Sequence, residues 1–263
     1  MSPVALPSPD RFEADYFDLP AALSALEDGR PLVFPPFRLT RTRIDGRDYT
    51  FCSNYDRDPI QKAQRKGGFY EADDLAEVAK HLPVAPNVLA VGANVGNHAI
   101  YFAARLAATV TVIEPNPVAL APLVANIVLN DLTHRIRMDA LGIGLGAAPE
   151  AGLTLRPPAR NLGGTRMERA KGGALEVHPG DALFAEDTFD LIKIDVEGME
   201  IEVLSGLQQT IRRCRPLLFI EVDETNRTAF NRWMAAERYA VIFETRHYGA
   251  NVNFLVQPIG EKT

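Results

Sequence analysis

The sequence predicts a doubly wound α/β domain, with a mostly parallel sheet that ends in an antiparallel hairpin and an N-terminal cap. From Asn87 onward, short apolar runs alternate with helical segments, as they do in the crossover units of a parallel sheet. The last two apolar runs are joined by too few residues for another crossover helix. We therefore assign residues 1–85 to an N-terminal cap region and residues 86–263 to the α/β domain.

The composition is that of an ordinary globular protein. The 263 residues are 46% hydrophobic and 24% charged, which is sufficient to bury a core. The net charge of −6 argues against nucleic acid as a partner, because phosphate binding requires clustered Lys and Arg. The N-terminus lacks a signal-peptide pattern, and no run approaches the ~20 apolar residues of a membrane span. We therefore expect a cytoplasmic protein with no membrane partner.

The cap region is expected to be largely irregular. One helix is predicted near Ala21–Glu27, and the alternation in residues 40–55 predicts one or two short strands. A second helix is predicted from the acidic turn after Glu71 and the apolar face that residues 75–82 form. Residues 69–71 (Phe-Tyr-Glu) precede this helix, where they either close over a ligand or belong to the core.

The α/β domain is predicted to contain five parallel strands and four crossover helices. The strands are Val88–Val91, Thr109–Ile113, Ile136–Met138, Phe189–Ile194 and Leu217–Val222. The helices are Asn97–Leu106, Pro117–Asn130, Gly198–Arg212 and Thr225–Glu237. The final hairpin joins residues 240–245 to residues 252–256, and a Gly- and Pro-rich insertion, residues 142–179, is predicted to hold a small hairpin around Leu153–Leu155.

The turn after the first strand carries glycine at a spacing that suits a ligand. Gly92, Asn94 and Gly96 form G-x-N-x-G, where the backbone turns tightly and the next helix presents free N–H groups. Glu114 ends the second strand about twenty residues later, where an acidic side chain accepts hydrogen bonds from both hydroxyls of a ribose. The alternative for Glu114 is a helix cap or a solvated carboxylate. The pattern favours a ribosylated ligand.

Two classes of ribosylated ligand fit this arrangement. Dinucleotides usually follow G-x-G-x-x-G, and the segment Ala93–Asn97 departs from that spacing. S-adenosylmethionine carries a ribose, an adenine and an amino-acid end, and it has no phosphate to accommodate. We therefore predict S-adenosylmethionine as the cofactor. The residues predicted to bind it are Gly92, Ala93, Asn94, Gly96, Asn97, Glu114, Pro115 and Asn116.

Carboxylates follow the fourth and fifth strands, at one rim of the predicted sheet. Asp195 and Glu197 follow the fourth strand, and Glu221 and Asp223 end the fifth. We predict that Asp195 is a catalytic base or orients the acceptor, with Glu197 and Glu221 as alternatives. Helix capping is the other interpretation of Asp195, and a first-turn charge is that of Glu197. We predict no metal, although Asp195, Glu221 and Asp223 would suit a divalent cation.

Three further features admit both a functional and a structural interpretation. His98 lies just past the glycine turn and either faces the cofactor or forms a hydrogen bond between helix and sheet. His247, in the final hairpin, is either an acceptor-site base or a surface residue. The segment N-L-G-G at residues 161–164 is either part of a lid over the acceptor or a simple turn.

Several stretches together resemble the FkbM-type methyltransferase family. They are, in order, VGANVGNHAIYFA, VIEPNP, VANIVLN, NLGG, FDLIKIDVEGMEIEVLSGL and RPLLFIEVD. The similarity covers about residues 68–256 and implies the Rossmann-like fold of class I methyltransferases. It also implies methyl transfer from S-adenosylmethionine, mostly to oxygen on small molecules or sugars. By this resemblance Gly92, Asn94, Gly96 and Glu114 hold the cofactor, and the stretch from Asp195 borders the reacting centre.

One position departs from the family pattern. Ala90 stands where methyltransferases of this type usually have an aspartate that organises the glycine turn and helps to hold the cofactor's ammonium group. Losing one charge-assisted hydrogen bond would weaken binding by roughly 1.5 to 3 kcal/mol, which does not abolish it. We therefore expect O-methylation of a small-molecule or saccharide hydroxyl. The alternatives are an NAD(P)-dependent oxidoreductase and a cofactor-binding protein without catalytic activity.

Overall fold

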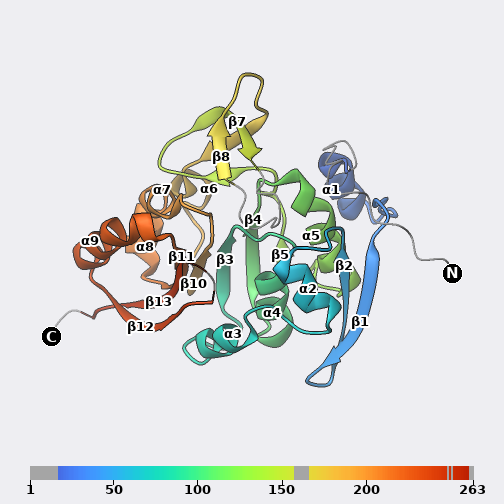
Figure 1. The fold of residues 1–263 in the computed structure, drawn as a ribbon, viewed down its shortest axis with the longest axis horizontal. Helices are drawn as coiled ribbons and strands as arrows, with labels where there is room; N and C mark the ends of the chain where they lie inside the picture. The colour runs from blue at the N-terminus through green and yellow to red at the C-terminus, as the bar shows by residue number, and fades with distance from the viewer. Residues whose placement is uncertain (1–16, 157–165, 248, 250, 261–263) are drawn as a thin grey trace.

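A seven-stranded sheet forms the centre of the computed structural model, which describes residues 17–156, 166–247, 249 and 251–260. The strand order is β12-β13-β11-β10-β3-β4-β5 (Figure 1). The five strands from β11 to β5 are parallel, and β13 is antiparallel to both of its neighbours. The predicted Rossmann-like fold with a terminal hairpin is therefore confirmed. The strands are β3 (Asn87–Val91), β4 (Thr109–Ile113), β5 (Ile136–Arg137), β10 (Leu191–Ile194), β11 (Leu217–Val222), β12 (Tyr239–Thr245) and β13 (Val252–Pro258).

Helices cover both faces of this sheet because its central strands are buried on both sides. Residues 88–91 of β3 and all of β10 are buried, with no polar alternation. One core cluster joins α4, α5 and the cap to one face, and a second joins α7, α8 and α9 to the other. The helices are α4 (Asn97–Arg105), α5 (Pro117–Leu129), α6 (Gly180–Leu183), α7 (Glu200–Gly206), α8 (Gln208–Cys214) and α9 (Arg227–Glu237).

The crossover after β10 differs from the prediction of one helix over residues 198–212. The structure has two helices there, α7 and α8, which are separated by Leu207. Gly206, the last residue of α7, packs directly against the carbonyl of Gly146, so a side chain at this position would collide with backbone. Helix α7 ends at this close approach, and α8 begins after Leu207. Similarly, α9 is preceded by a 3-10 turn, Glu224–Asn226, that Asp223 caps.

The described part of the insertion between β5 and β10 contains more strands than the sequence predicts. It forms a four-stranded sheet in the order β6-β9-β7-β8, and the predicted hairpin near Leu153 is its β7–β8 pair. A register shift between Ala151 and Leu153 breaks the alternation of β7, which obscures the strand in the sequence. The strands of this inserted sheet are β6 (Gly144–Leu145), β7 (Glu150–Arg156), β8 (Arg166–Arg169) and β9 (Leu175–His178).

In the described part of the cap, from residue 17 onward, the chain forms a two-stranded ribbon and three short helices. Helix α2 was not predicted, although Asp58 caps it and Pro59 occupies its first position. The cap packs against α4 through ring contacts that link Tyr49, Phe69 and Tyr101. The elements are α1 (Leu19–Glu27), β1 (Arg38–Ile44), β2 (Arg47–Ser53), α2 (Pro59–Arg65) and α3 (Ala72–Ala79).

Two asparagines on α5 join the cap to the glycine turn. Asn126 accepts a hydrogen bond from Cys52 N at 2.6 Å and donates one to Val95 O at 2.8 Å. Asn130, one turn later on the same face, binds both backbone groups of Thr50 at 3.0 and 2.8 Å. The cap and the α/β domain thus share one core, and the boundary after residue 85 stays a prediction.

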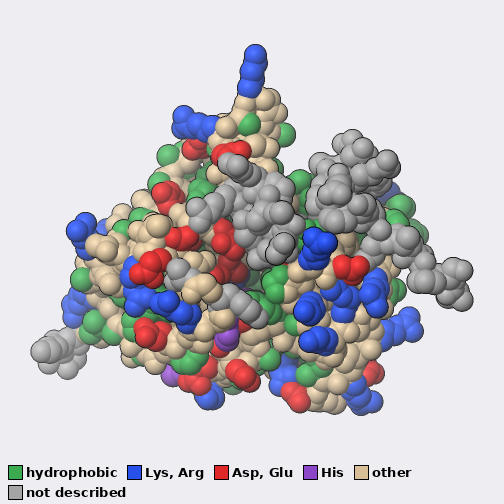
Figure 2. Space-filling model, viewed as in Figure 1, with side chains coloured by type: hydrophobic (Ala, Val, Ile, Leu, Met, Phe, Trp, Pro, Cys, Tyr) green, Lys and Arg blue, Asp and Glu red, His purple; other side chains and the backbone are tan. Residues whose placement is uncertain are grey.

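Charge is distributed unevenly over the surface. Lys and Arg side chains gather over the cap, around β1, β2 and α2, whereas Asp and Glu side chains gather near the middle of the viewed face (Figure 2). Among the described residues, no helix is long and apolar enough to cross a membrane.

Candidate functional site

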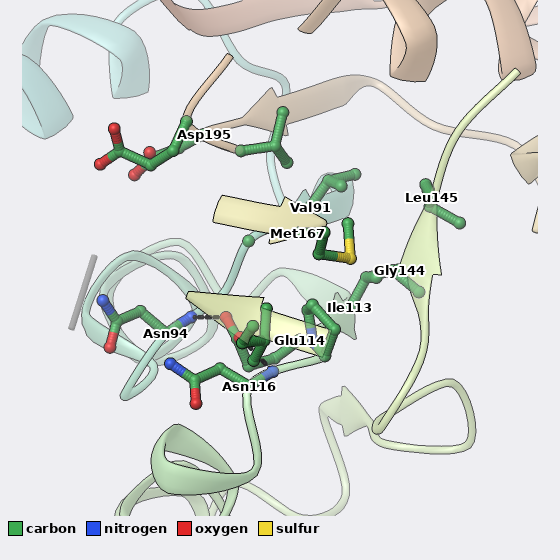
Figure 3. Close-up of a pocket in the computed structure, with 14 residues that line it drawn as sticks. Val91, Asn94, Ile113, Glu114, Asn116, Gly144, Leu145, Met167 and Asp195 are labelled. Atoms are coloured by element: carbon green, nitrogen blue, oxygen red, sulfur yellow. Dashed lines mark hydrogen bonds between the residues drawn. The ribbon is translucent and has the colours of Figure 1, made fainter. Parts of the chain in front are cut away.

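A cavity lies at the carboxyl ends of β3, β4 and β10, next to the inserted sheet (Figure 3). Ligands of open α/β sheets bind at these strand ends. We call it the strand-end cavity. Its lining residues are Val91, Gly92, Asn94, Ile113, Glu114, Pro115, Asn116, Gly144, Leu145, Leu155, Met167, Asp195, Val196 and Glu197.

Five of the eight residues predicted to bind the cofactor line this cavity, namely Gly92, Asn94, Glu114, Pro115 and Asn116. The other three, Ala93, Gly96 and Asn97, lie behind it. The Asn97 side chain is 2% exposed and binds the backbone of Tyr70 through both amide atoms, at 3.0 and 2.9 Å. A Cβ at Gly96 would lie 2.8 Å from Leu123 Cδ1. These residues hold the turn against the cap and α5, which sequence spacing alone did not reveal.

The glycine turn is compressed between two strand ends. Gly92, Asn94 and Gly96 all adopt positive φ, at 75°, 49° and 88°. Gly92 cannot carry a side chain, because a Cβ would collide with the backbone oxygen of Asp195. The Asn94 Oδ1 atom is buried and has no hydrogen-bond partner within the described part of the chain. A buried acceptor without a partner is costly, and a ligand that donates a hydrogen bond to it would remove that cost.

Glu114 is the central acid of the cavity. Its side chain is 6% exposed, and its two oxygens accept hydrogen bonds from Asn94 N at 2.6 Å and Asn116 N at 2.8 Å (Figure 3). Burial raises the pKa of Glu114 to about 7, against the lowering effect of these two hydrogen bonds. Glu114 does not cap α5, because Asn116 has that role. Each carboxylate oxygen keeps a lone pair that can accept from a ribose hydroxyl.

A second cluster of polar side chains consists of Asp195, Glu197, Glu221 and Lys193, and we call it the Asp195 group. One carboxylate oxygen from each of Asp195, Glu197 and Glu221 lies within 4.8 Å of the others. Lys193, 4% exposed, donates hydrogen bonds from Nζ to Gly92 O at 2.8 Å and to Asp195 Oδ2 at 3.1 Å. Three of the four carboxylates predicted at this rim therefore lie together, and a buried lysine that the sequence pattern does not predict lies beside Asp195.

The charges of this group oppose one another. Burial alone would raise the pKa of Asp195, but the neighbouring Lys193 ammonium and a hydrogen bond with Glu221 hold that pKa below its usual range. Burial, together with the nearby Asp195 and Glu197 carboxylates, raises the pKa of Glu221 to about 9. At neutral pH the pair therefore shares one proton, and the Lys193 ammonium favours the ionised form of Asp195.

Asp195 does not cap the next helix, and Glu197 does not lie in its first turn. Helix α7 begins at Glu200, and Asp195 makes no capping bond to it. Glu197 precedes the helix in a left-handed conformation, with φ of 50°. Asp223 instead accepts a hydrogen bond from Thr225 N at 2.9 Å. The third carboxylate beside Asp195 and Glu221 is that of Glu197. The Lys193 ammonium already neutralises Asp195, which weakens the case for a cation there.

Both histidines named from the sequence have packing partners. His98 Nε2 lies 3.2 Å from Glu71 Oε2, between α4 and the start of α3. His247 Nε2 lies 2.8 Å from Asp74 Oδ2, which ties the final hairpin to α3. Burial opposes ionisation of Glu71, but His98 outweighs it and lowers the pKa of Glu71. Residues 161–164 lie outside the described residues.

Comparison with known proteins identifies the family. The profile of the methyltransferase FkbM domain matches residues 90–249, which is more than half of the chain. The chain belongs to the FkbM methyltransferase family. The matched region of this FkbM-family protein begins at Ala90 and contains the glycine turn, Glu114 and the Asp195 group. No curated protein matches the chain.

Three solved structures resemble this FkbM-family protein at low sequence identity. FkbM from Methylobacillus flagellatus KT shares 18% identity, with a TM-score of 0.45 over 65% of this chain and 43% of that one. The tRNA m1G37 methyltransferase of M. jannaschii shares 14% identity, with a TM-score of 0.47 over 88% and 57%. A Pyrococcus abyssi tRNA (uracil-54, C5)-methyltransferase in complex with S-adenosyl-L-homocysteine shares 14%, with a TM-score of 0.46 over 83% and 43%. The match thus spans roughly half the length of each of these proteins.

Removal of the buried lysine should destabilise the FkbM-family fold. Lys193→Met leaves Asp195 and the Gly92 carbonyl without their buried partner, which we expect to lower the free energy of unfolding by about 3 kcal/mol. The double variant Lys193→Met, Asp195→Asn should recover part of this loss, because no charge is then left unpaired. Urea denaturation measures both effects.

The matched control is Lys62→Met on the exposed side of α2, which should change stability by less than about 0.5 kcal/mol. A Lys193→Met protein as stable as this control would show that the Lys193–Asp195 contact does not support the site.

Proposed function

We propose that the protein transfers a methyl group from S-adenosylmethionine to a hydroxyl oxygen of a small molecule or saccharide. The observation that carries this proposal is Glu114, a buried carboxylate at the end of β4 that faces the strand-end cavity beside the glycine turn. Such an acid suits the two hydroxyls of a ribose. Membership in the FkbM methyltransferase family supports methyl transfer over the alternative oxidoreductase and over a protein that only binds the cofactor.

The residues of the cavity fit the parts of this cofactor. Glu114 offers free lone pairs to the ribose, and the unpartnered Asn94 Oδ1 offers an acceptor to the amino-acid end. Gly92 leaves the backbone open to close approach. An aspartate at position 90 would help to organise the glycine turn, and Ala90 supplies no polar group for this. Lys193, the neighbour of Ala90 in the sheet, instead fixes the turn by a hydrogen bond to the Gly92 carbonyl. We infer that these groups hold the cofactor despite the departure at Ala90.

The Asp195 group is proposed to receive the acceptor. S-adenosylmethionine supplies an activated methyl on a sulfonium, so the protein must align the acceptor hydroxyl and accept its proton. Asp195 lines the cavity in ionised form and can accept that hydrogen bond. Glu221 carries a proton at neutral pH, and Glu197 borders the same space. We assign the base to Asp195, with Glu197 and Glu221 as orienting groups, and we propose no metal.

Calorimetric titration tests the cofactor directly. We expect S-adenosylmethionine and S-adenosylhomocysteine to bind, and NAD to give no heat, because the turn lacks the glycine spacing for a pyrophosphate. Glu114→Ala should weaken binding of S-adenosylhomocysteine by at least about tenfold, since it removes two charge-assisted hydrogen bonds. NAD binding without binding of the other two ligands would favour the oxidoreductase instead.

Cofactor affinity should depend on pH through Glu114. Its pKa is raised to about 7, and ribose hydroxyls require the ionised form, so binding must release a proton at lower pH. We expect the Kd for S-adenosylhomocysteine to rise as pH falls from 8 to 5.5, approaching tenfold per unit below about pH 7. The free energy of unfolding has the opposite pH dependence. Because the pKa of Glu114 is raised in the folded protein, this group stabilises the fold at low pH, and the contribution is lost as pH rises to about 7.

Glu114→Gln is the control for this pH dependence, since an amide does not titrate. If the Kd of Glu114→Gln still rises as pH falls, another group is responsible for the titration. If the Kd of the wild-type protein does not change with pH, the predicted role of Glu114 ionisation is wrong.

Amide substitutions separate the roles of the two coupled acids. Asp195→Asn should lower kcat by about 10²- to 10⁴-fold, because the ionised base is lost. Glu221→Gln should cost less, because its amide resembles the protonated carboxyl already present at neutral pH. The measurement is release of S-adenosylhomocysteine with a panel of sugars and hydroxylated small molecules. Wild-type turnover by Asp195→Asn would exclude it as the base, and cofactor binding without turnover of any acceptor would favour a binding-only protein.

A further inference from the structure

Two apolar residues of the inserted sheet line the strand-end cavity. Leu155 on β7 and Met167 on β8 are direct partners in the antiparallel ladder, so their side chains lie next to each other on one face. Both are half-buried, although they belong to a surface insertion. Figure 3 shows Met167 between Val91 and Ile113, the last residues of β3 and β4. The inserted sheet therefore supplies one wall of a cavity whose other walls come from the central sheet.

The proposed cofactor pose determines what this wall meets. The amino-acid end lies at the glycine turn and the ribose at Glu114, so the purine must extend to the remaining part of the cavity. Away from the glycine turn and the acids, the lining consists of the pair from the inserted sheet together with Ile113, Pro115, Asn116, Gly144, Leu145 and Val196. It is largely apolar, as the face of a purine requires, and a methionine thioether interacts favourably with aromatic rings.

Backbone contacts fix this wall relative to the ribose site. Glu114 forms a β-bridge with Leu141, and its carbonyl accepts a hydrogen bond from Gly142 N at 2.9 Å. Two residues later, Gly144 lies so close to Met167 that a Cβ there would be 2.9 Å from Met167 Cε. The segment that leads into the inserted sheet is thus held by the backbone of Glu114, and Met167 packs against the start of that sheet at Gly144. These contacts fix the position of the wall relative to Glu114.

We propose that Leu155 and Met167 of the inserted sheet form the apolar wall against which the cofactor's purine packs. This inference rests on the proposed function and deepens it, because it makes the insertion a specificity-determining part of the cofactor site.

Alanine substitution at either residue tests the contact by titration. Met167→Ala and Leu155→Ala should each weaken binding of S-adenosylhomocysteine by about tenfold. Adenosine, used as a competitor, should lose the same factor, because it contains the purine and no amino-acid end. Met167→Leu, which conserves volume, should stay within about twofold of wild type. Thr154→Ala is the matched control, since alternate residues of β7 face away from the cavity and Thr154 pairs with Glu168 on the other face.

A measurement on the unaltered protein covers the case in which a variant fails to fold. Saturating S-adenosylhomocysteine should slow oxidation of Met167 by hydrogen peroxide, measured by peptide mass spectrometry, because the purine covers its thioether. Met234 on α9 packs against the core but does not line the cavity, so it should oxidise at the same rate with and without ligand.

The outcomes distinguish this inference from the proposed function. If the wild-type protein binds S-adenosylhomocysteine and both Met167→Ala and Leu155→Ala bind it with the same affinity, the proposed purine wall is wrong while the proposed function stands. The same holds if the ligand leaves the oxidation rate of Met167 unchanged. Tighter binding by Met167→Ala would overturn the purine wall as well, because Met167 would then obstruct the cavity. Weaker binding of S-adenosylhomocysteine with unchanged adenosine binding would place the pair at the amino-acid end. A wild-type protein that binds neither S-adenosylmethionine nor S-adenosylhomocysteine would overturn both proposals.

Discussion

The two hydrogen bonds that Glu114 accepts connect the parts of the site that lie far apart in the sequence. Asn94 N belongs to the turn after β3, and Asn116 N begins the connection to α5. A buried carboxylate is costly without such donors, so the turn must hold these N–H groups in place whether or not a ligand is bound. Asn94 donates this hydrogen bond from a backbone with positive φ. The glycine turn is thus shaped as much by this acid as by its glycines.

The Asp195 group follows a second constraint, which is charge balance in a buried space. Four ionisable groups meet there, and only one of them, Lys193, is a cation. Asp195 uses that cation, so Glu221, the next acid along the rim, retains its proton. Two carboxyl groups of nearly the same intrinsic acidity therefore have pKa values shifted in opposite directions by their surroundings alone.

The sequence predicted what periodicity and strand ends determine, and it missed what depends on contacts between distant segments. The strands and most crossover helices are where the apolar runs placed them, because burial on both faces leaves an unambiguous pattern. The inserted sheet was reduced to one hairpin, since its strands are short and Gly152 interrupts β7. Asn97 has the spacing of a cofactor ligand, yet its amide holds Tyr70. The contribution of Met167 to the cavity depends on strand pairing that no local pattern encodes.

Lys193 shows which signal in the sequence could have located the site more fully. It stands at the centre of the apolar run of β10, and a lysine is almost never fully buried unless it has partners. Register places it beside Ala90 on β3 and Phe219 on β11, neither of which offers an acceptor. Its partners must therefore lie beyond the strand ends, at the turn that follows β3 and the acid that follows β10. A charged residue inside an otherwise apolar parallel strand thus points toward the polar rim where such folds bind their ligands.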